Sequence, residues 1–252
     1  MSYEIVIGDM SIYNTLTPEE KKSIFGKTPF TISGGDIPAI MGVNPYETNV
    51  ELYRRKKKKK RKDLNEAMER GFDYETAVKL MFKHEYKGIL KQTGFKGMVR
   101  NIELPYLTGV PDDILIAESD IKGEDNEILI TKDTRLVHEI KSKYLIKKEA
   151  GFNNLDENMQ NYVNFIHPMY ELQMQFYLYL LDLKFGVYTI SIVSAPYYTS
   201  DRKTVVTSRI LERDDIRINY MLNEVDEFYQ RLINDREPAL KQRTGGLKWV
   251  KK

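Results

Sequence analysis

Two short stretches decide the fold, Gly109-Val-Pro-Asp-Asp-Ile-Leu-Ile-Ala117 and Val137-His-Glu-Ile-Lys-Ser142. The first carries an apolar run of strand length, and the second is also strand-like. Successive side chains of a strand point to opposite faces, so Glu139 and Lys141 project from the same face. Asp112 stands in a Pro-Asp turn that leads into the first strand. If the two strands pair, the carboxylates of Asp112 and Glu139 meet at one point of the sheet.

Two carboxylates from neighbouring strands form an oxygen-rich site. Such a site suits magnesium, which binds through carboxylates, waters and phosphate oxygens. A lysine beside the metal, here Lys141, can hold or deprotonate an attacking water, or neutralise charge on a phosphate. The spacing of Glu139 and Lys141 alone is also that of a common structural salt bridge. Asp112 is the residue that favours a metal site over the salt bridge.

The composition excludes several classes of protein. The chain has 252 residues, of which 41% are hydrophobic and 30% charged, so it can bury a sizeable core. It has no cysteine, which excludes disulfides, thiolate zinc sites, iron–sulfur clusters and cysteine nucleophiles. No apolar run reaches about 18 residues, and residues 1–25 lack the pattern of a signal peptide. We therefore expect an intracellular protein without a membrane span.

Other catalytic motifs are not found in the sequence. The three histidines, His84, His138 and His167, have no spacing that supports a zinc site or a serine–histidine pair. Neither GxxxxGK[ST] nor GxGxxG occurs, and the pair Gly34–Gly35 predicts a tight turn rather than a nucleotide cradle. The chemistry is therefore expected to depend on carboxylates.

Residues 54–62 read RRKKKKKRK, nine basic residues in succession. The net charge is +2, but without these nine, 30 basic residues face 37 acidic ones, a balance of −7. Such a run attracts polyanions, nucleic acid above all. A solvated helix face, a disordered loop and a nuclear localisation signal are the alternatives. We expect Arg54, Arg55, Lys56, Lys57 and Lys58 to contact DNA phosphates.

The sequence predicts an α/β protein. Helices are expected over 18–25 with Thr17 as cap, after Asp36 in 32–46, from Thr48 or Asn49, over 63–87, on both sides of Pro168 within 156–183, and after Asp214 or Asp215. Strands are expected at 98–104, 106–109, 114–117, 127–130, 136–142, 187–194 and 204–211. No repeat and no domain boundary is visible. We expect one domain over 1–240, made of an arm (1–30), a helical region with the basic run (31–62), a core with the candidate site (63–195) and a C-terminal strand and helix (204–235), followed by a basic tail (241–252).

Four segments in this order carry a resemblance to a known family. They are ISGGDIPAIMGVNPYETNVELYRRK at 32–56, Gly71-Phe-Asp-Tyr-Glu75, Pro111-Asp112 with Glu139-Ile-Lys141, and Tyr170-Glu-Leu-Gln173-Met-Gln175-Phe-Tyr177. Together they resemble the PD-(D/E)xK nucleases, and within them the lambda-exonuclease, or YqaJ-type viral recombinase, branch. The resemblance covers roughly residues 30–195. It implies a restriction-endonuclease-like core, in which helices flank a central mixed β-sheet.

The resemblance also implies roles for single residues. Asp112 and Glu139 would bind the metal, Lys141 would assist the water, and Glu75 would support the metal site from its helix. Gln173 would lie near the nucleophile or the scissile phosphate. Gln173 and Gln175 are about 200° apart on a helix, so only one can point into the site. We choose Gln173, because it matches the first glutamine of the family pattern.

The chain departs from the family pattern at three places. Gly35 stands where a serine is usual, and Ser33 is the candidate to replace its phosphate contact. Asp113 stands where glycine is usual, and is expected either to compete with Asp112 as a ligand or to face solvent. The 26 residues between Asp112 and Glu139 exceed the usual gap, and we interpret the excess as a β-hairpin extension around Gly123.

The function implied is that of a Mg²⁺-dependent deoxyribonuclease that acts as a 5′→3′ exonuclease on linear double-stranded DNA ends in phage- or virus-type recombination. The resemblance implies two metal ions, with Mn²⁺ able to substitute, a homotrimer and a single-strand annealing protein as partner. The alternatives are an endonuclease of the same core, for restriction, repair or junction resolution, and a non-catalytic nucleic-acid-binding module. Bacterial cytoplasm and eukaryotic nucleus both remain open as locations.

Overall fold

The computed structural model describes residues 3–26, 28–58, 66–123, 125–145, 167–194 and 203–241, and within 66–74 only the backbone. A sheet of five strands lies at its centre, in the order β11-β10-β9-β6-β3. The strands β9 and β10 are parallel, and all other neighbours in this sheet are antiparallel. Their bounds are β3 Leu90–Gln92, β6 Asp113–Ala117, β9 Arg135–Leu145, β10 Phe185–Ser194 and β11 Lys203–Glu212.

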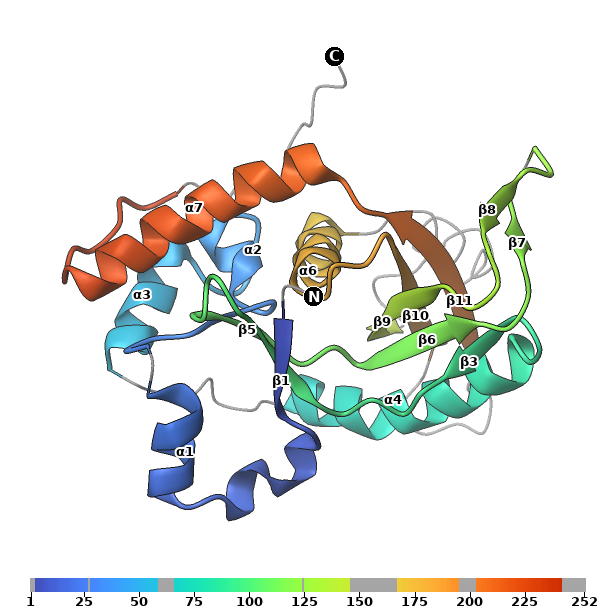
Figure 1. The fold of residues 1–252 in the computed structure, drawn as a ribbon, viewed down its shortest axis with the longest axis horizontal. Coiled ribbons are helices and arrows are strands. Elements are labelled where there is room, and N and C mark those ends of the chain that lie inside the picture. Colours follow the sequence, from blue (N-terminus) through green and yellow to red (C-terminus); the bar gives the residue numbers. More distant parts are fainter. Residues whose placement is uncertain are drawn as a thin grey trace.

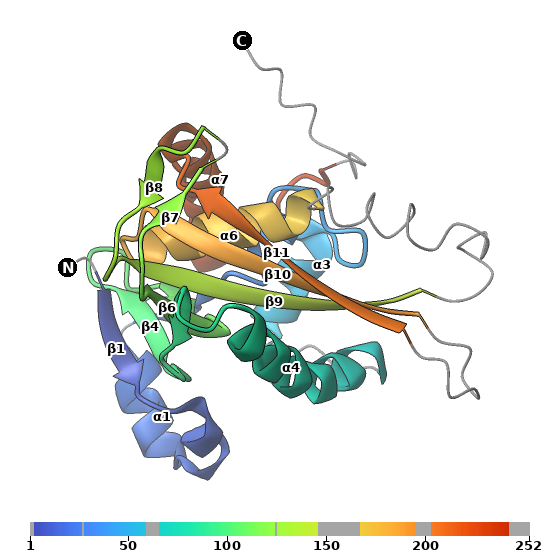
Figure 2. The ribbon, with the colours of Figure 1, turned by 90° about the vertical axis from the view of Figure 1, so that its right-hand side faces the viewer.

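Helices cover both faces of this sheet (Figures 1 and 2). Helix α4, Glu66–Glu85, places Phe82 against Leu136 and Val187 on one face. Helix α6, Pro168–Leu180, packs on the other face, where the next residues along the same strands, Val137 and Tyr188, enter a second core. This alternation of neighbours between two cores is the period of a strand with both faces buried. The expected mixed sheet between helices is confirmed.

A second sheet and a hairpin adjoin the main sheet. The second sheet has the order β1-β4-β5-β2, with β1 Tyr3–Ile7, β2 Ile32–Ser33, β4 Met98–Asn101 and β5 Leu107–Gly109. The hairpin joins β7, Ile121–Lys122, to β8, Ile128–Ile130, and its turn is closed by a 2.9 Å hydrogen bond from the N–H of Gly123 to the carbonyl of Glu127. The predicted extension around Gly123 is therefore confirmed. Strand β1 was not predicted, because residues 1–30 were interpreted as an irregular arm although the stretch YEIVI at Tyr3–Ile7 is itself strand-like.

Three of the remaining helices begin at predicted caps, and the 3₁₀ helix was not predicted. Thr17 and Thr48 each form a capping box, with Glu20 and Glu51 respectively, and Asp214 accepts from the N–H of Arg217. The helices are a 3₁₀ helix at Met10–Thr15, α1 Pro18–Phe25, α2 Ile37–Ile40, α3 Asn49–Lys57 and α7 Asp215–Ile233. Helix α6 begins at Pro168 as predicted, whereas the helix expected before it, over 156–166, lies outside the described residues.

Asp36 does not cap α2 in the way expected from its position. Its side chain makes no hydrogen bond to the first turn of the helix. Instead the carboxylate accepts from Ser33 and from two cations of α3. The prediction of a cap was wrong because an ion pair formed between distant segments replaced the local hydrogen bond.

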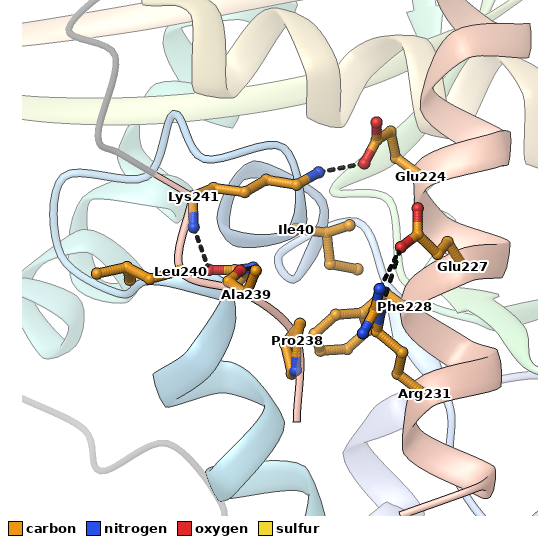
Figure 3. A pocket seen from close by; sticks show the side chains of 10 residues that line it. Ile40, Glu224, Glu227, Phe228, Arg231, Pro238, Ala239, Leu240 and Lys241 are labelled. Atoms are coloured by element: carbon orange, nitrogen blue, oxygen red, sulfur yellow. Dashed lines mark hydrogen bonds and ion pairs between the residues drawn. The ribbon is translucent and has the colours of Figure 1, made fainter. Parts of the chain in front are cut away.

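Residues 234–241 follow α7 and pack against α3 (Figure 3). The amide of Asn49 holds this segment at both sides of Leu240, since Nδ2 donates to the carbonyl of Ala239 (2.8 Å) and Oδ1 accepts from the N–H of Lys241 (3.1 Å). Lys241 also pairs with Glu224 of α7. The cavity at this junction, about 140 Å³, contains none of the predicted catalytic residues in its lining. It is therefore a packing feature of the C-terminal region.

Helix α6 approaches the second sheet very closely at Tyr177. A Cβ added to Gly109 would lie 2.7 Å from Tyr177 and 2.8 Å from Leu180, and one added to Gly34 would lie 2.9 Å from Tyr177. The Tyr177 hydroxyl donates to the carbonyl of Val110 (3.1 Å). Glycine is thus required at these two positions by the approach of the helix.

We predict that Gly109→Ala lowers the free energy of unfolding by about 1–3 kcal/mol, the usual cost of an overpacked core. Gly35→Ala is the matched control, because a Cβ at Gly35 meets nothing within 4 Å. Urea unfolding of both variants measures the difference. Equal stability of the two variants would contradict the packing described for α6.

Candidate active site

The pairing of β6 with β9 brings the two predicted metal ligands together. In this register Asp113 lies opposite His138, so Asp112 reaches the backbone next to Glu139. Its Oδ2 accepts a 2.6 Å hydrogen bond from the N–H of Ile140. Asp112 is thereby fixed beside the strand that carries Glu139 and Lys141.

Glu139 is the centre of the site and is 1% exposed. Its Oε1 accepts from the ammonium of Lys141 and, at 2.6 Å, from the amide of Gln173 on α6. Its Oε2 is buried and has no hydrogen-bond partner among the described residues. One oxygen of a buried carboxylate is therefore available to a further ligand.

The two glutamines of α6 point in different directions, as the helical angle requires. Gln173 reaches Glu139, whereas Gln175 donates to the carbonyl of Glu212 (2.9 Å) and accepts from the N–H of Asp214 (2.9 Å). Gln175 thus ties α6 to the start of α7. Of the two candidates, Gln173 is the one that lies in the site.

Glu75 reaches the site through a residue that the sequence analysis did not single out. The ammonium of Lys79 donates to Glu75 (2.6 Å) and to the carbonyl oxygen of Asp112 (2.8 Å). Lys79 is one helical turn after Glu75, and an acid followed by a base at this spacing is a common helix pair. That spacing was the available signal, but many exposed helix pairs share it.

Burial and repulsion between nearby acids raise the pKa of both carboxylates. Burial and the nearby Asp112 together raise the pKa of Glu139 to about 8, against the opposing effect of Lys141. Burial, together with Glu75, also raises the pKa of Asp112, although Lys141 and the N–H of Ile140 oppose it. Burial and the like charge each disfavour ionisation, so a state in which both of these buried carboxylates are negatively charged is unfavourable unless a cation lies beside them.

In contrast to the two acids, Lys141 is stabilised in its charged form. Burial disfavours its charge, but Glu139 and Asp112 outweigh burial and raise the pKa of its ammonium. Its Nζ also lies 5.7 Å from the ring centroid of Tyr170, which stacks on Tyr188 at 6.0 Å. Lys141 is therefore a cation in the metal-free site, and the two tyrosines form a wall beside its ammonium.

The donor set fits a small divalent cation. Glu139 Oε2 is unpaired, and Asp112 Oδ1 accepts no hydrogen bond from the described part of the chain. Both are hard oxygen donors, the type that Mg²⁺ and Mn²⁺ prefer. Across the described ranges no three His, Asp or Glu side chains gather as a ready metal cluster. A metal here would thus take two carboxylates, with waters or phosphate oxygens as its other ligands.

Asp113 is neither a competing ligand nor a solvent-facing residue. It is 2% exposed, and its Oδ1 accepts from Thr93 Oγ1 (3.1 Å) and from the N–H groups of Phe95 (2.9 Å) and Ile114 (2.7 Å). Both alternatives expected for it were wrong. The carboxylate instead fixes the turn that connects β3 to β4.

The described part of the basic run is occupied by partners within the protein. Arg54 forms a two-point ion pair with Glu237, at 2.9 and 2.7 Å. Arg55 pairs with Glu47 and Asp36, Lys56 with Asp36 at 2.7 Å, and Lys57 with Asp235 at 2.9 Å. Lys58 is exposed, and residues 59–62 lie outside the described part. If residues 54–57 contacted DNA, each cation would have to leave its acidic partner or bind the acid and a phosphate at the same time.

Ser33, the other predicted phosphate contact, lies in the same cluster. Its N–H and its hydroxyl both donate to Asp36 Oδ2, at 2.8 and 2.9 Å. Asp36 is 4% exposed and surrounded by Arg55 and Lys56, whose charges hold its pKa low although burial opposes them. Ser33 therefore contributes to an ion-pair network that joins α2 to α3.

The family model of the YqaJ-like viral recombinase domain matches residues 26–183. This span is more than half of the chain, and it contains all five predicted catalytic residues. The chain belongs to the family of YqaJ-like viral recombinase domains. The resemblance stated from the sequence is thus confirmed at the level of the family.

Solved structures of similar fold are exonucleases. An alkaline exonuclease (LHK-Exo) from Laribacter hongkongensis has a TM-score of 0.53 and 18% sequence identity, over 84% of this chain and 92% of that one. A phage-related exonuclease from Haemophilus somnus 129PT has a TM-score of 0.49 and 16% identity, over 82% and 96%. The first similarity shows that the two chains share a fold, the expected α/β arrangement of a mixed sheet flanked by helices. No curated protein matches the chain, and none of the helices in the described ranges is long and apolar enough to cross a membrane.

Proposed function

We propose that this protein is a divalent-metal-dependent deoxyribonuclease that digests linear double-stranded DNA from its 5′ ends. The buried carboxylate of Glu139 carries the proposal, because one of its oxygens is unpaired beside Asp112 while the other is held by Lys141 and Gln173. A structural salt bridge would not need a second buried acid whose charge raises the pKa of the first. Membership of the YqaJ-like family and the fold shared with LHK-Exo support the same activity.

In this proposal Asp112 and Glu139 hold Mg²⁺, or Mn²⁺ in its place, in a site for two ions. Bound metal would acidify a water for in-line attack on phosphorus and stabilise charge on the leaving 3′ oxygen. Glu75 supports the site from α4 through Lys79.

The ammonium of Lys141 has a different task from the metal ligands. Glu139 and Asp112 raise the pKa of this ammonium and so favour its charged form. Charged Lys141 is placed to neutralise the charge that grows on the phosphate, while Gln173 donates to Oε1 of Glu139 and fixes that carboxylate. The second role expected for Lys141, to hold or deprotonate the attacking water, stays part of the proposal.

The proposal includes an assembly and partners that belong to recombination. We propose one nuclease domain over residues 1–240, a ring-shaped homotrimer that keeps hold of one DNA end, and a single-strand annealing protein that receives the exposed 3′ strand. Digestion from a 5′ end would release nucleotides from that strand and shorten it. The complementary strand would stay intact, with its 3′ end exposed.

Digestion of defined substrates tests the proposed activity directly. We predict that a 5′-phosphorylated linear duplex is shortened in Mg²⁺ and in Mn²⁺, and that a closed circular plasmid stays intact. A 5′-hydroxyl duplex and a chelator arm measure the requirement for the end group and for the metal. A cut circle would favour an endonuclease, whereas DNA binding without cleavage in either metal would favour a non-catalytic module.

The two central residues can be tested by Glu139→Gln and Lys141→Ala. Each should lower the rate of cleavage at least about 100-fold, the effect of removing one charge-stabilising group from a transition state. Glu139→Gln should melt close to the wild type, because it removes one of two repelling buried acids, whereas Lys141→Ala leaves both acids without their cation and should lower the melting temperature without unfolding the protein. Glu85→Gln and Lys122→Ala are controls at exposed positions away from the site. Cleavage at the wild-type rate by either test variant would refute the site.

A further inference from the structure

A lysine-rich groove lies between the C-terminal end of α4 and strand β3, next to the carboxylate site. Its volume is about 600 Å³. Figures 1 and 2 show α4 and β3 side by side at this place. The lining includes five lysines and two acids, Lys79, Lys83, Lys87, Lys91, Lys96, Asp113 and Glu118.

The sequence places three of these lysines in a row. Lys79 and Lys83 are four residues apart on α4, and Lys87 follows four residues later, just beyond the end of the helix. Side chains at this spacing lie on one face, about 6 Å apart along the axis. Lys91 of β3 adds a fourth cation from the strand beside the helix. The groove thus presents a line of positive charge that two elements contribute.

Three of these lysines have no acidic partner in the described part of the chain. Lys83, Lys87 and Lys91 are exposed, and no carboxylate of the described residues forms an ion pair with them. The two acids in the lining, Asp113 and Glu118, keep their charges, so the five lysines leave a net charge of +3 in the groove (5 − 2). The arginines and lysines of α3, in contrast, each have an acidic partner. Free positive charge is therefore concentrated here rather than on the described part of the basic run.

The groove meets the candidate active site at one residue, Lys79. Lys79 lines the groove, and the same ammonium donates to the carbonyl oxygen of Asp112 and to Glu75. A polyanion that lay in the groove would therefore contact the side chain that joins Glu75 to Asp112. One strand of duplex DNA carries one phosphate per roughly 3.4 Å of axis, so the 12 Å or so from Lys79 to Lys87 would face about three or four phosphates of that strand.

We infer that this groove binds the phosphodiester backbone of the nucleic acid, beyond the nucleotide that is cut. The inference deepens the proposed function and rests on it. Phosphates would replace the missing acidic partners of Lys83, Lys87 and Lys91, and they would leave the ion pairs of α3 intact. The groove would then set how strongly the substrate is held, while Asp112, Glu139 and Lys141 act on the scissile bond.

The salt dependence of binding tests the groove. The full chain carrying Glu139→Gln, which keeps the DNA uncut, is compared with the same chain carrying Lys83→Gln, Lys87→Gln and Lys91→Gln in addition. The probe is a 5′-phosphorylated duplex in Mg²⁺ over a series of salt concentrations. Loss of three phosphate contacts lowers the slope of log K against log salt by about 2.7, and affinity at low salt should fall at least tenfold.

The matched control removes the same charge from another surface. Lys122→Gln, Lys132→Gln and Lys184→Gln change three exposed lysines outside the groove, and the slope should stay that of the parent. A groove variant whose slope equals that of the parent would overturn the inference, and so would an equal loss in the control. Binding of polyglutamate that is lost in the groove variant while DNA affinity is unchanged would assign the groove to an acidic polypeptide and overturn it as well.

Failure of the groove and failure of the nuclease are distinguished by the wild-type chain. If the wild type cuts linear DNA and the groove variant keeps the slope, the groove is refuted and the proposed function stands. If the wild type neither binds nor cuts DNA, both are refuted. Thermal melting of the groove variant should match the parent, because the three lysines are exposed and make no ion pair with the described residues.

Discussion

The pairing of β6 with β9 is the interaction on which the site depends. It places the carboxylate of Asp112 against the backbone N–H of Ile140, next to Glu139 on the same strand. Two buried acids at this point repel each other, and the pKa of each is raised. A buried charge needs a compensating partner, and Lys141 supplies only one positive charge. The fold thus places more negative than positive charge at this point, and a bound divalent cation would neutralise the excess.

The rest of the structure holds this pair of strands in place. Helix α6 packs on the face of Val137 and carries Gln173 to Glu139, while α4 packs on the face of Leu136 and carries Glu75. The close approach of α6 requires Gly109. The core packing and the chemistry therefore use the same helices, so a change in packing would move the groups of the site.

Local periodicity allowed much of the site to be predicted from the sequence. Strand alternation places Glu139 and Lys141 together, and the angle between residues on a helix separates Gln173 from Gln175. The caps Thr17 and Thr48 follow from single side chains near their own helices. These features depend on neighbours within a few residues, which a sequence displays directly.

Interactions between distant segments could not be predicted in this way. Arg55 and Lys56 meet Asp36 only after α2 and α3 have packed, so a basic run that resembles a DNA contact is partly an internal network. The engaged carboxylate of Asp113 depends on the β3–β4 turn that surrounds it. The lysines of the groove are likewise assembled from a helix and a strand.

The central claim is that Asp112 and Glu139 hold one divalent ion between them, and anomalous diffraction from crystals soaked in Mn²⁺ tests it most directly. The account predicts an anomalous peak within direct ligand distance of an oxygen from each carboxylate. Crystals of Glu139→Gln, soaked in the same way, should lose or weaken the peak. No peak in the wild type, or a peak remote from both side chains, would contradict the account.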